Sequence, residues 1–273
     1  MQQHELVLKL IEYFNDTYGL SIDENLRPTT EHKLLEKMLS VEISDLDQLV
    51  SDEKQIPLLG ELLDVFLVKH TEFFRDREQF ETLTKIVLPN LTGRVSHDHY
   101  HDLRIWSAGC ASGEEPYSIL ITALEFFQEK YWEIQCGILA TDVSLEGILA
   151  AGKGVYKKDK FLKRDLSVVK KYADLKNDSE FVFKDRIKSE ITVREFNLNS
   201  EVYPFKKRFH VVFCRNVLIY FNANRRDFTV KRILNSMESG GYLFLGDAER
   251  LDIAKYPVIN VGAGVYQKID FCD

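Results

Sequence analysis

The sequence predicts an α/β protein in which a doubly wound, mostly parallel sheet follows an all-helical amino-terminal domain. Up to about residue 70, apolar residues recur at helical spacing, whereas beyond about residue 100 short apolar strands alternate with helix patterns. The chain of 273 residues is long enough for one sizeable domain and a smaller one. Its content of 45% hydrophobic and 29% charged residues is typical of globular proteins.

The first part of the chain is expected to form short amphipathic helices. Apolar clusters at near-helical spacing lie at Leu6–Phe14, Leu34–Leu39 and Leu58–Phe66. Because Gly and Pro interrupt helices, breaks are predicted at Gly19, near Arg27-Pro28 and at Ile56-Pro57. A further helix from Phe80 to Leu88 should end at Pro89-Asn90. We place the domain boundary after residue 76, so that residues 1–76 form the helical domain and residues 77–273 the sheet domain.

The second part is expected to supply the sheet. Its predicted strands are Leu103–Ala108, Cys136–Thr141, His210–Phe213, Tyr242–Leu245 and a closing pair within Val258–Ile269. Its predicted helices are Glu115–Lys130, Leu145–Ala151 and Asn224–Met237. Two alternating runs, Phe181–Phe183 and Ile191–Phe196, predict a small antiparallel hairpin. The hairpin would belong to a β-subdomain inserted at about residues 160–197.

Composition favours a cytoplasmic protein. Glu5, Glu12 and Asp16 interrupt any basic-then-apolar leader, and no apolar run approaches the roughly 18 residues that cross a membrane. The four cysteines are widely spaced and form no disulfide or metal signature. The net charge is −7, yet residues 151–210 hold 16 Lys and Arg against 9 Asp and Glu. That basic segment is either a docking surface for an acidic partner or a solvated face.

The strongest functional signal is the segment Ile105–Tyr117, which reads IWSAGCASGEEPY. An apolar strand runs into a loop of small residues, which lets a ligand approach the backbone closely. The loop lacks the Gly-Lys-Ser/Thr ending of a phosphate-binding loop. Glu114 and Glu115 at the start of the next helix would repel a pyrophosphate, which disfavours NAD and FAD. A cationic cofactor with an adenosine end fits better, and we predict S-adenosylmethionine.

Two polar residues follow later strands. Asp142 closes the second strand, where an acidic side chain can accept hydrogen bonds from both ribose hydroxyls. The alternative is a helix N-cap, which Ser144 could supply instead. Asn216 follows the third strand and offers both a donor and an acceptor to a methionine or adenine group. The residues after it, Val217–Ile219, are apolar enough to be core.

Two further segments have competing interpretations. Thr71–Asp76 lies at the seam between the two parts of the chain, and its Phe-Phe-Arg sequence could form an apolar floor with Arg75 at the rim. A domain-seam ion pair is an equal alternative. His97, His99 and His101 could share one face only in a strand, and nothing else in the sequence completes a metal site. We therefore predict an exposed loop there and no metal.

Six segments together resemble the CheR-type chemotaxis receptor methyltransferases, which are S-adenosylmethionine-dependent protein-glutamate O-methyltransferases. In family order they are Thr71–Arg75, Trp106–Ser118, Ala140–Asp142, Phe196–Leu198, Phe213–Phe221 and Gly240–Gly246. The resemblance implies a Rossmann-like methyltransferase sheet with an amino-terminal helical domain and an inserted antiparallel β-subdomain. It implies cofactor contacts from Thr71, Arg75, Glu115, Asp142, Asn197, Leu198, Asn216 and Val217. It also implies catalytic roles for Arg75 and Tyr220.

The resemblance further implies methyl transfer to glutamates in the cytoplasmic helical domain of chemotaxis receptors, with S-adenosylhomocysteine as the product.

The chain departs from the family in reading Gly246-Asp247-Ala248-Glu249 instead of Gly-His-Ser-Glu, which we interpret as a changed loop near the substrate mouth. Its first domain is acidic where the family often presents basic residues, so docking through the basic segment Ala151–His210 is expected instead. Lys176–Phe183 contains no glycine, so no tether to a receptor's carboxyl-terminal peptide is expected.

Two alternatives remain open from the sequence. The protein could be an S-adenosylmethionine methyltransferase acting on another protein or a small molecule. It could also be a cofactor-sensing module without turnover, against which Arg75 and Asn216 argue. In each case we expect a cytoplasmic monomer without nucleic-acid binding or membrane insertion.

Overall fold

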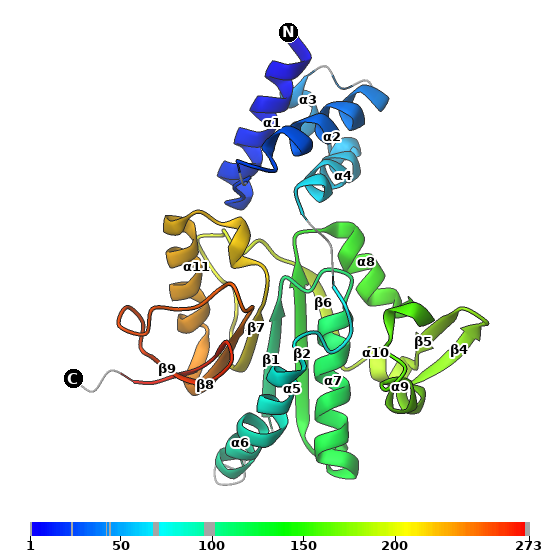
Figure 1. Ribbon diagram of the computed structural model, residues 1–273, viewed down its shortest axis with the longest axis vertical. Coiled ribbons are helices and arrows are strands. Elements are labelled where there is room, and N and C mark those ends of the chain that lie inside the picture. The colour runs from blue at the N-terminus through cyan, green and yellow to red at the C-terminus, as the bar shows by residue number, and fades with distance from the viewer. Residues whose placement is uncertain are drawn as a thin grey trace.

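The computed structural model describes residues 2–22, 24–41, 43, 45–67, 71–95 and 102–270. Figure 1 shows a group of helices at the amino-terminal end of the molecule and, beyond it, a twisted sheet with helices on its faces. The pattern change that the sequence shows between residues 70 and 100 therefore corresponds to a change of architecture.

The first group of helices has its own apolar core. Its elements are α1 (Gln2–Tyr18), α2 (Arg27–Ser40), α3 (Leu46–Ser51), the 3-10 helix η1 (Glu53–Gln55) and α4 (Ile56–Phe66). Leu10 and Phe14 of α1 are fully buried in this core. Gly19 follows α1 with a φ of +73°, a conformation that glycine adopts without strain. Pro28 and Pro57 lie in the first turns of α2 and α4, where no N–H donor is needed. The predicted breaks are confirmed.

The helical stretch that follows is longer than predicted. It consists of α5 (Arg77–Thr82), a π-helical turn η2 (Leu83–Val87) and α6 (Leu88–Val95). The prediction that the helix ends at Pro89-Asn90 was wrong. The N–H of Leu88 bonds to the carbonyl of Leu83 across the widened π turn, and Pro89 then occupies the beginning of α6. A proline at the start of a helical segment removes no hydrogen bond that the segment needs.

The predicted strands of the main sheet are confirmed within two residues at most ends. They are β1 (Asp102–Ala108), β2 (Gln135–Asp142), β7 (Phe209–Cys214), β8 (Met237–Leu245), β9 (Val258–Gly262) and β10 (Val265–Lys268). With β6 (Ile191–Glu195) they form a seven-stranded sheet in the order β6-β2-β1-β7-β8-β10-β9. The first five strands in this order run parallel, and β10 and β9 close the edge antiparallel. The strand order reverses direction between β1 and β7, which is where open α/β sheets bind ligands.

Helices cover both faces of the main sheet. They are α7 (Glu114–Phe127), the 3-10 helix η3 (Gln128–Glu133), α8 (Leu145–Lys153) and α11 (Ala223–Asn235). Successive strand residues point to opposite faces, so buried Ile105 packs in one core cluster and buried Trp106 in another. Residues of α5 and α7 join the first cluster, and Val230 and Ile233 of α11 join the second. This two-sided burial confirms the doubly wound architecture.

The inserted segment forms a separate small sheet, but not the predicted hairpin. Its strands are β3 (Val155–Lys157), β4 (Ala173–Asn177) and β5 (Glu180–Phe183), in the antiparallel order β3-β5-β4. The helices η4 (Lys158–Lys160), α9 (Leu166–Tyr172) and α10 (Asp185–Lys188) accompany them. The expected pairing of Phe181–Phe183 with Ile191–Phe196 was wrong, because β6 pairs in parallel with β2 at the edge of the main sheet. A short alternating run does not specify its partner strand, and the open edge of β2 provides one.

The helical group contacts the sheet domain at the end of α1 and just after it. The Ser21 N–H donates to the Tyr220 carbonyl at 2.7 Å, and the Asn197 side chain donates to the Thr17 carbonyl at 2.8 Å. Asn199 also donates to Thr17. These bonds join α1 to loops at the carboxyl ends of the parallel strands. None of the helices in the described ranges has the length and apolar character needed to span a bilayer.

Candidate functional site

A pocket of about 560 Å³ lies at the carboxyl ends of β1, β2 and β7, with the helical group on its other side. All nine residues singled out from the sequence line it: Thr71, Arg75, Glu115, Asp142, Asn197, Leu198, Asn216, Val217 and Tyr220. They come from five separate segments of the chain, and the fold brings them to one place. Their individual roles remain predictions.

The helical group also contributes to the pocket, which the sequence did not indicate. Leu20, Leu26, Lys33 and Val65 are among the residues that line it. These residues fall in ordinary helix and turn patterns with no chemical motif. Only the docking of α1 onto the Tyr220 loop brings them to the site.

The small-residue loop after β1 forms the floor of the pocket. The N–H groups of Gly109 and Cys110 both donate to the Thr141 carbonyl, at 2.7 and 2.9 Å. Gly109 has a φ of +80°, and a Cβ there would lie 2.3 Å from a methyl carbon of Val217. The side chain of Val217 can reach this position only because residue 109 is glycine.

Asp142 is positioned by the backbone around it. Its Oδ2 accepts the N–H of Ala111 at 2.7 Å, and its Oδ1 accepts the N–H of Ser144 at 2.8 Å. Ser144, rather than Asp142, caps α8 by accepting the Gly147 N–H at 3.0 Å. Burial raises the pKa of Asp142, and the backbone N–H bonds oppose that rise. The helix-cap alternative for Asp142 is therefore excluded, and its carboxylate keeps further lone pairs toward the pocket.

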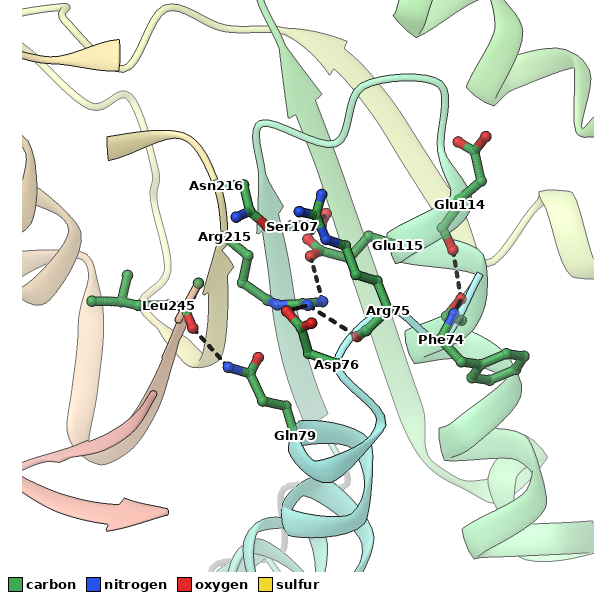
Figure 2. Close-up of polar contacts among 12 residues, drawn as sticks. Phe74, Arg75, Asp76, Gln79, Ser107, Glu114, Glu115, Arg215, Asn216 and Leu245 are labelled. Atoms are coloured by element: carbon green, nitrogen blue, oxygen red, sulfur yellow. Dashed lines mark hydrogen bonds and ion pairs between the residues drawn. The ribbon is translucent and has the colours of Figure 1, made fainter. Parts of the chain in front are cut away.

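Glu115 belongs to a buried polar cluster that Figure 2 shows. Its Oε1 accepts the Ser107 hydroxyl at 2.7 Å, and its Oε2 accepts Arg215 Nη1 at 3.2 Å. Burial raises the pKa of Glu115, while Arg215 and the Ser107 hydroxyl lower it. The same guanidinium pairs with Asp76 and donates to the Arg75 carbonyl at 2.9 Å. A seam ion pair therefore exists between Asp76 and Arg215, and the sequence did not indicate the role of Arg215.

The loop after β7 is held by a second buried group that the sequence did not reveal. Glu249 is fully buried, and its Oε2 accepts the N–H groups of Asn216 and Gly246 at 2.7 and 2.8 Å. Its Oε1 accepts the N–H of Ile219 at 3.2 Å. The residues that depart from the family pattern, Asp247 and Ala248, are exposed and do not line the pocket.

Non-glycine residues in the left-handed backbone region gather around this pocket. Phe74 and Asp76 flank Arg75 with φ values of 53° and 55°, Ala111 has a φ of 45°, and Asn216 has a φ of 58°. Such residues cost about 1–3 kcal/mol each and persist where the surrounding structure holds them. Their concentration here supports a binding or catalytic function for the pocket.

Metal and thiol chemistry receive no support from the part of the chain that the structure describes. Within the described ranges, no group of three or more His, Cys, Asp and Glu side chains is arranged to hold a metal ion. His97, His99 and His101, where the sequence predicts an exposed loop and no metal, lie outside the described residues. Burial raises the pKa of the Cys110 and Cys214 thiols well above the ordinary value, which disfavours a thiolate nucleophile.

The pocket suits S-adenosylmethionine in size and in chemistry. Its volume lies within the range typical of sites for ligands of this size. Asp142 presents a carboxylate at the tip of the second strand, as a ribose requires. Glu115 adds anionic character that a sulfonium cation tolerates and a pyrophosphate does not.

The comparisons with known proteins agree with this geometry. A family model described as "CheR methyltransferase, SAM binding domain" matches residues 69–265. A chemotaxis protein methyltransferase of Borreliella burgdorferi is 31% identical over 248 residues, covering 89% of this chain and 87% of that protein. Chemotaxis protein methyltransferase 1 of Pseudomonas aeruginosa is 34% identical over 246 residues, covering 88% of each. The chain therefore belongs to the CheR family of S-adenosylmethionine-dependent chemotaxis protein methyltransferases.

Proposed function

We propose that this protein methylates glutamate side chains in the cytoplasmic helical domain of chemotaxis receptors, producing glutamyl methyl esters and S-adenosylhomocysteine. The observation that carries the proposal is the convergence on one pocket of the nine predicted residues, which come from five segments of the chain. The family membership supports methyl transfer in chemotaxis, and the chemistry of the pocket supports a carboxylate acceptor.

We assign the cofactor contacts to residues that line the pocket. Asp142 accepts hydrogen bonds from the ribose hydroxyls through the lone pairs that its backbone partners leave open. Glu115, which lines the pocket, would hold the amino-acid end of the cofactor. Leu198 and Val217 supply apolar wall. The side-chain amide of Asn216 offers a donor and an acceptor, because its backbone N–H is already bonded to Glu249. The remaining contacts are assigned to Thr71, Arg75 and Asn197.

The Asn197 side chain also bonds within the protein, which leaves fewer of its hydrogen-bonding groups for the cofactor. Its Nδ2 donates to the Thr17 carbonyl and its Oδ1 accepts the Asn199 N–H at 2.8 Å. One donor is therefore used to hold α1 against the site. We assign its cofactor contact to the groups that remain.

The reaction needs positioning more than acid–base chemistry. When bound, S-adenosylmethionine supplies an electrophilic methyl group on a sulfonium. A glutamate has a reference pKa near 4.3, so at neutral pH it is already the nucleophilic carboxylate. Arg75 and Tyr220, which line the same pocket, orient that carboxylate or the cofactor's own. Holding the reacting groups in near-attack geometry can supply roughly 7–11 kcal/mol of the barrier reduction.

The basic segment Ala151–His210 is the proposed docking surface for the acidic receptor helices. Several of its lysines are engaged within the protein, as Lys160 is with Glu114 and Lys171 with Glu125. Lys157, Lys163 and Lys170 are exposed and are available to a partner.

The turn between β4 and β5 lacks glycine, and we propose that no receptor peptide is tethered there. We also propose that the enzyme acts as a cytoplasmic monomer, without nucleic-acid binding or membrane insertion.

The test is methyl transfer from radiolabelled S-adenosylmethionine to membranes bearing receptors from the source organism. Base-labile label on the receptor bands is the expected result, because glutamyl esters hydrolyse in alkali. Arg75→Lys should lose most of the transfer, since a lysine cannot make a planar two-point contact. Arg104→Lys, at the opposite end of β1, is the matched control. Tight cofactor binding without transfer would instead favour another acceptor or a cofactor-sensing role.

A further inference from the structure

We propose that Arg215 is the positioning residue of the pocket, which holds both the Arg75 backbone and the Glu115 carboxylate in the positions that catalysis and cofactor binding require. The proposal rests on the roles given above to those two residues. Arg215 acts through them, because its hydrogen bonds run to the Arg75 carbonyl, Asp76 and Glu115.

The segment that carries Arg75 cannot hold its conformation by itself. Phe74 and Asp76, on either side of Arg75, both have left-handed backbone conformations that non-glycine residues rarely adopt. The segment lies between α4 and α5 and is not part of a helix or strand. Contacts from other elements must therefore maintain the position of Arg75.

Two such contacts are hydrogen bonds between the backbone of this segment and side chains of the sheet domain. The Phe74 N–H donates to the hydroxyl of Ser118 on α7 at 2.9 Å. The Arg75 carbonyl accepts from Nη2 of Arg215 at 2.9 Å. Figure 2 shows that the Arg75 side chain points away from α5, while its carbonyl faces Arg215. Arg215 thus holds the backbone at the Arg75 carbonyl, while the Arg75 side chain lines the pocket.

Arg215 differs from Ser118 because it joins several parts of the site. Its side chain is only 2% exposed, and from the loop after β7 its fork of donors reaches both the segment before α5 and the first turn of α7. A planar guanidinium serves several acceptors in fixed directions, which a lysine ammonium cannot do from the same stem. Its charge is balanced by Asp76 and Glu115, so the buried cation is compensated. The charge of Arg215 also lowers the pKa of Glu115, opposing the effect of burial.

The chain contains a matched control at the other end of β1. Arg104 also bridges two carboxylates and a carbonyl, namely those of Asp102, Glu238 and Arg208. Its side chain is 19% exposed and does not line the pocket. Arg215→Lys and Arg104→Lys therefore remove the same kind of three-way contact, one at the pocket and one far from it.

The experiment measures the dissociation constant of S-adenosylhomocysteine by calorimetry, kcat and KM for methyl transfer, and Tm for both variants. Arg215→Lys is expected to lower kcat/KM roughly 100-fold, the scale of a 1 Å misplacement, and to weaken S-adenosylhomocysteine binding. Arg104→Lys should change kcat/KM and the dissociation constant of S-adenosylhomocysteine by no more than about twofold. If the two variants lose Tm equally and activity equally, Arg215 has only a structural role and the proposal is wrong.

Two further variants keep the proposal testable. Asp76→Asn retains a residue type that tolerates the left-handed conformation and removes only the charge that Arg215 engages. It should weaken S-adenosylhomocysteine binding in the same direction even if Arg215→Lys fails to fold. In an Arg75→Ala background, Arg215→Lys should add less than its full effect, because the two residues act as a unit. Fully multiplicative losses would overturn the proposal. Since binding is read separately from transfer, failure of the proposed substrate would leave this outcome unaffected.

Discussion

Replacing Glu249 with glutamine is expected to loosen the loop that carries Asn216 and Tyr220 while preserving the shape of the side chain. Glu249 is fully buried and accepts three backbone N–H groups through its two oxygens. A glutamine has one acceptor oxygen. If that oxygen keeps the two bonds to Asn216 and Gly246, the new NH₂ group faces the N–H of Ile219.

The expected loss of stability follows from the meeting of two donors, the glutamine NH₂ group and the Ile219 N–H. Leaving a buried N–H without an acceptor costs about 1–3 kcal/mol. The two retained bonds lose their charge assistance, and the lower desolvation cost of a neutral amide offsets this loss. We therefore expect Glu249→Gln to lower the free energy of unfolding by about 2 kcal/mol. Because Asn216 and Tyr220 lie in the displaced loop, kcat/KM should also fall by roughly 10- to 100-fold.

The assay combines urea denaturation with methyl transfer, and Glu238→Gln serves as the control. Glu238 is 39% exposed in its ion pair with Arg104, at the other end of the sheet. Its replacement should change stability by less than about 1 kcal/mol and leave activity unchanged. If Glu249→Gln were as stable and as active as Glu238→Gln, the buried carboxylate would not be what holds the loop.

Three other substitutions give distinct expected results. Asp142→Asn should weaken S-adenosylhomocysteine binding about 10- to 100-fold by calorimetry, the equivalent of one hydrogen bond to a charged acceptor; an unchanged dissociation constant would contradict its ribose role. Gly113→Ala should lower stability in urea by more than about 1 kcal/mol, because its φ is +98° and a Cβ would lie 2.9 Å from the Ala151 Cα. Burial, followed by the Arg104 charge, lowers the pKa of His210, whose Nδ1 accepts the Arg104 N–H. The unfolded state then binds more protons, so stability should decline as pH falls below about 6.5, and His210→Gln should flatten this decline in denaturation curves between pH 5 and 7.

Much of the site could be predicted because its signals are local. The small-residue loop after β1, Asp142 at the end of β2 and Asn216 after β7 each lie where a parallel strand ends, and such ends meet at one edge of a sheet. Arg215 and Glu249 could not be predicted in the same way. Arg215 bonds to groups 100 or more residues distant in sequence, and Glu249 holds the N–H groups of Asn216 and Ile219, which are 33 and 30 residues distant. A charged residue in a loop is ordinarily solvated, so neither role is visible in the sequence.

The same distinction applies to the fold. Apolar periodicity and the positions of Gly and Pro determined the helices, the strands and the change from an all-helical part to an α/β part, because these depend on neighbours along the chain. Tertiary structure alone decided that β6 adds to β2 instead of pairing with β5, and that α1 docks on the Tyr220 loop to complete the pocket. Strand partners and domain contacts are chosen by complementary surfaces and free backbone hydrogen-bonding groups, which exist only once the chain has folded.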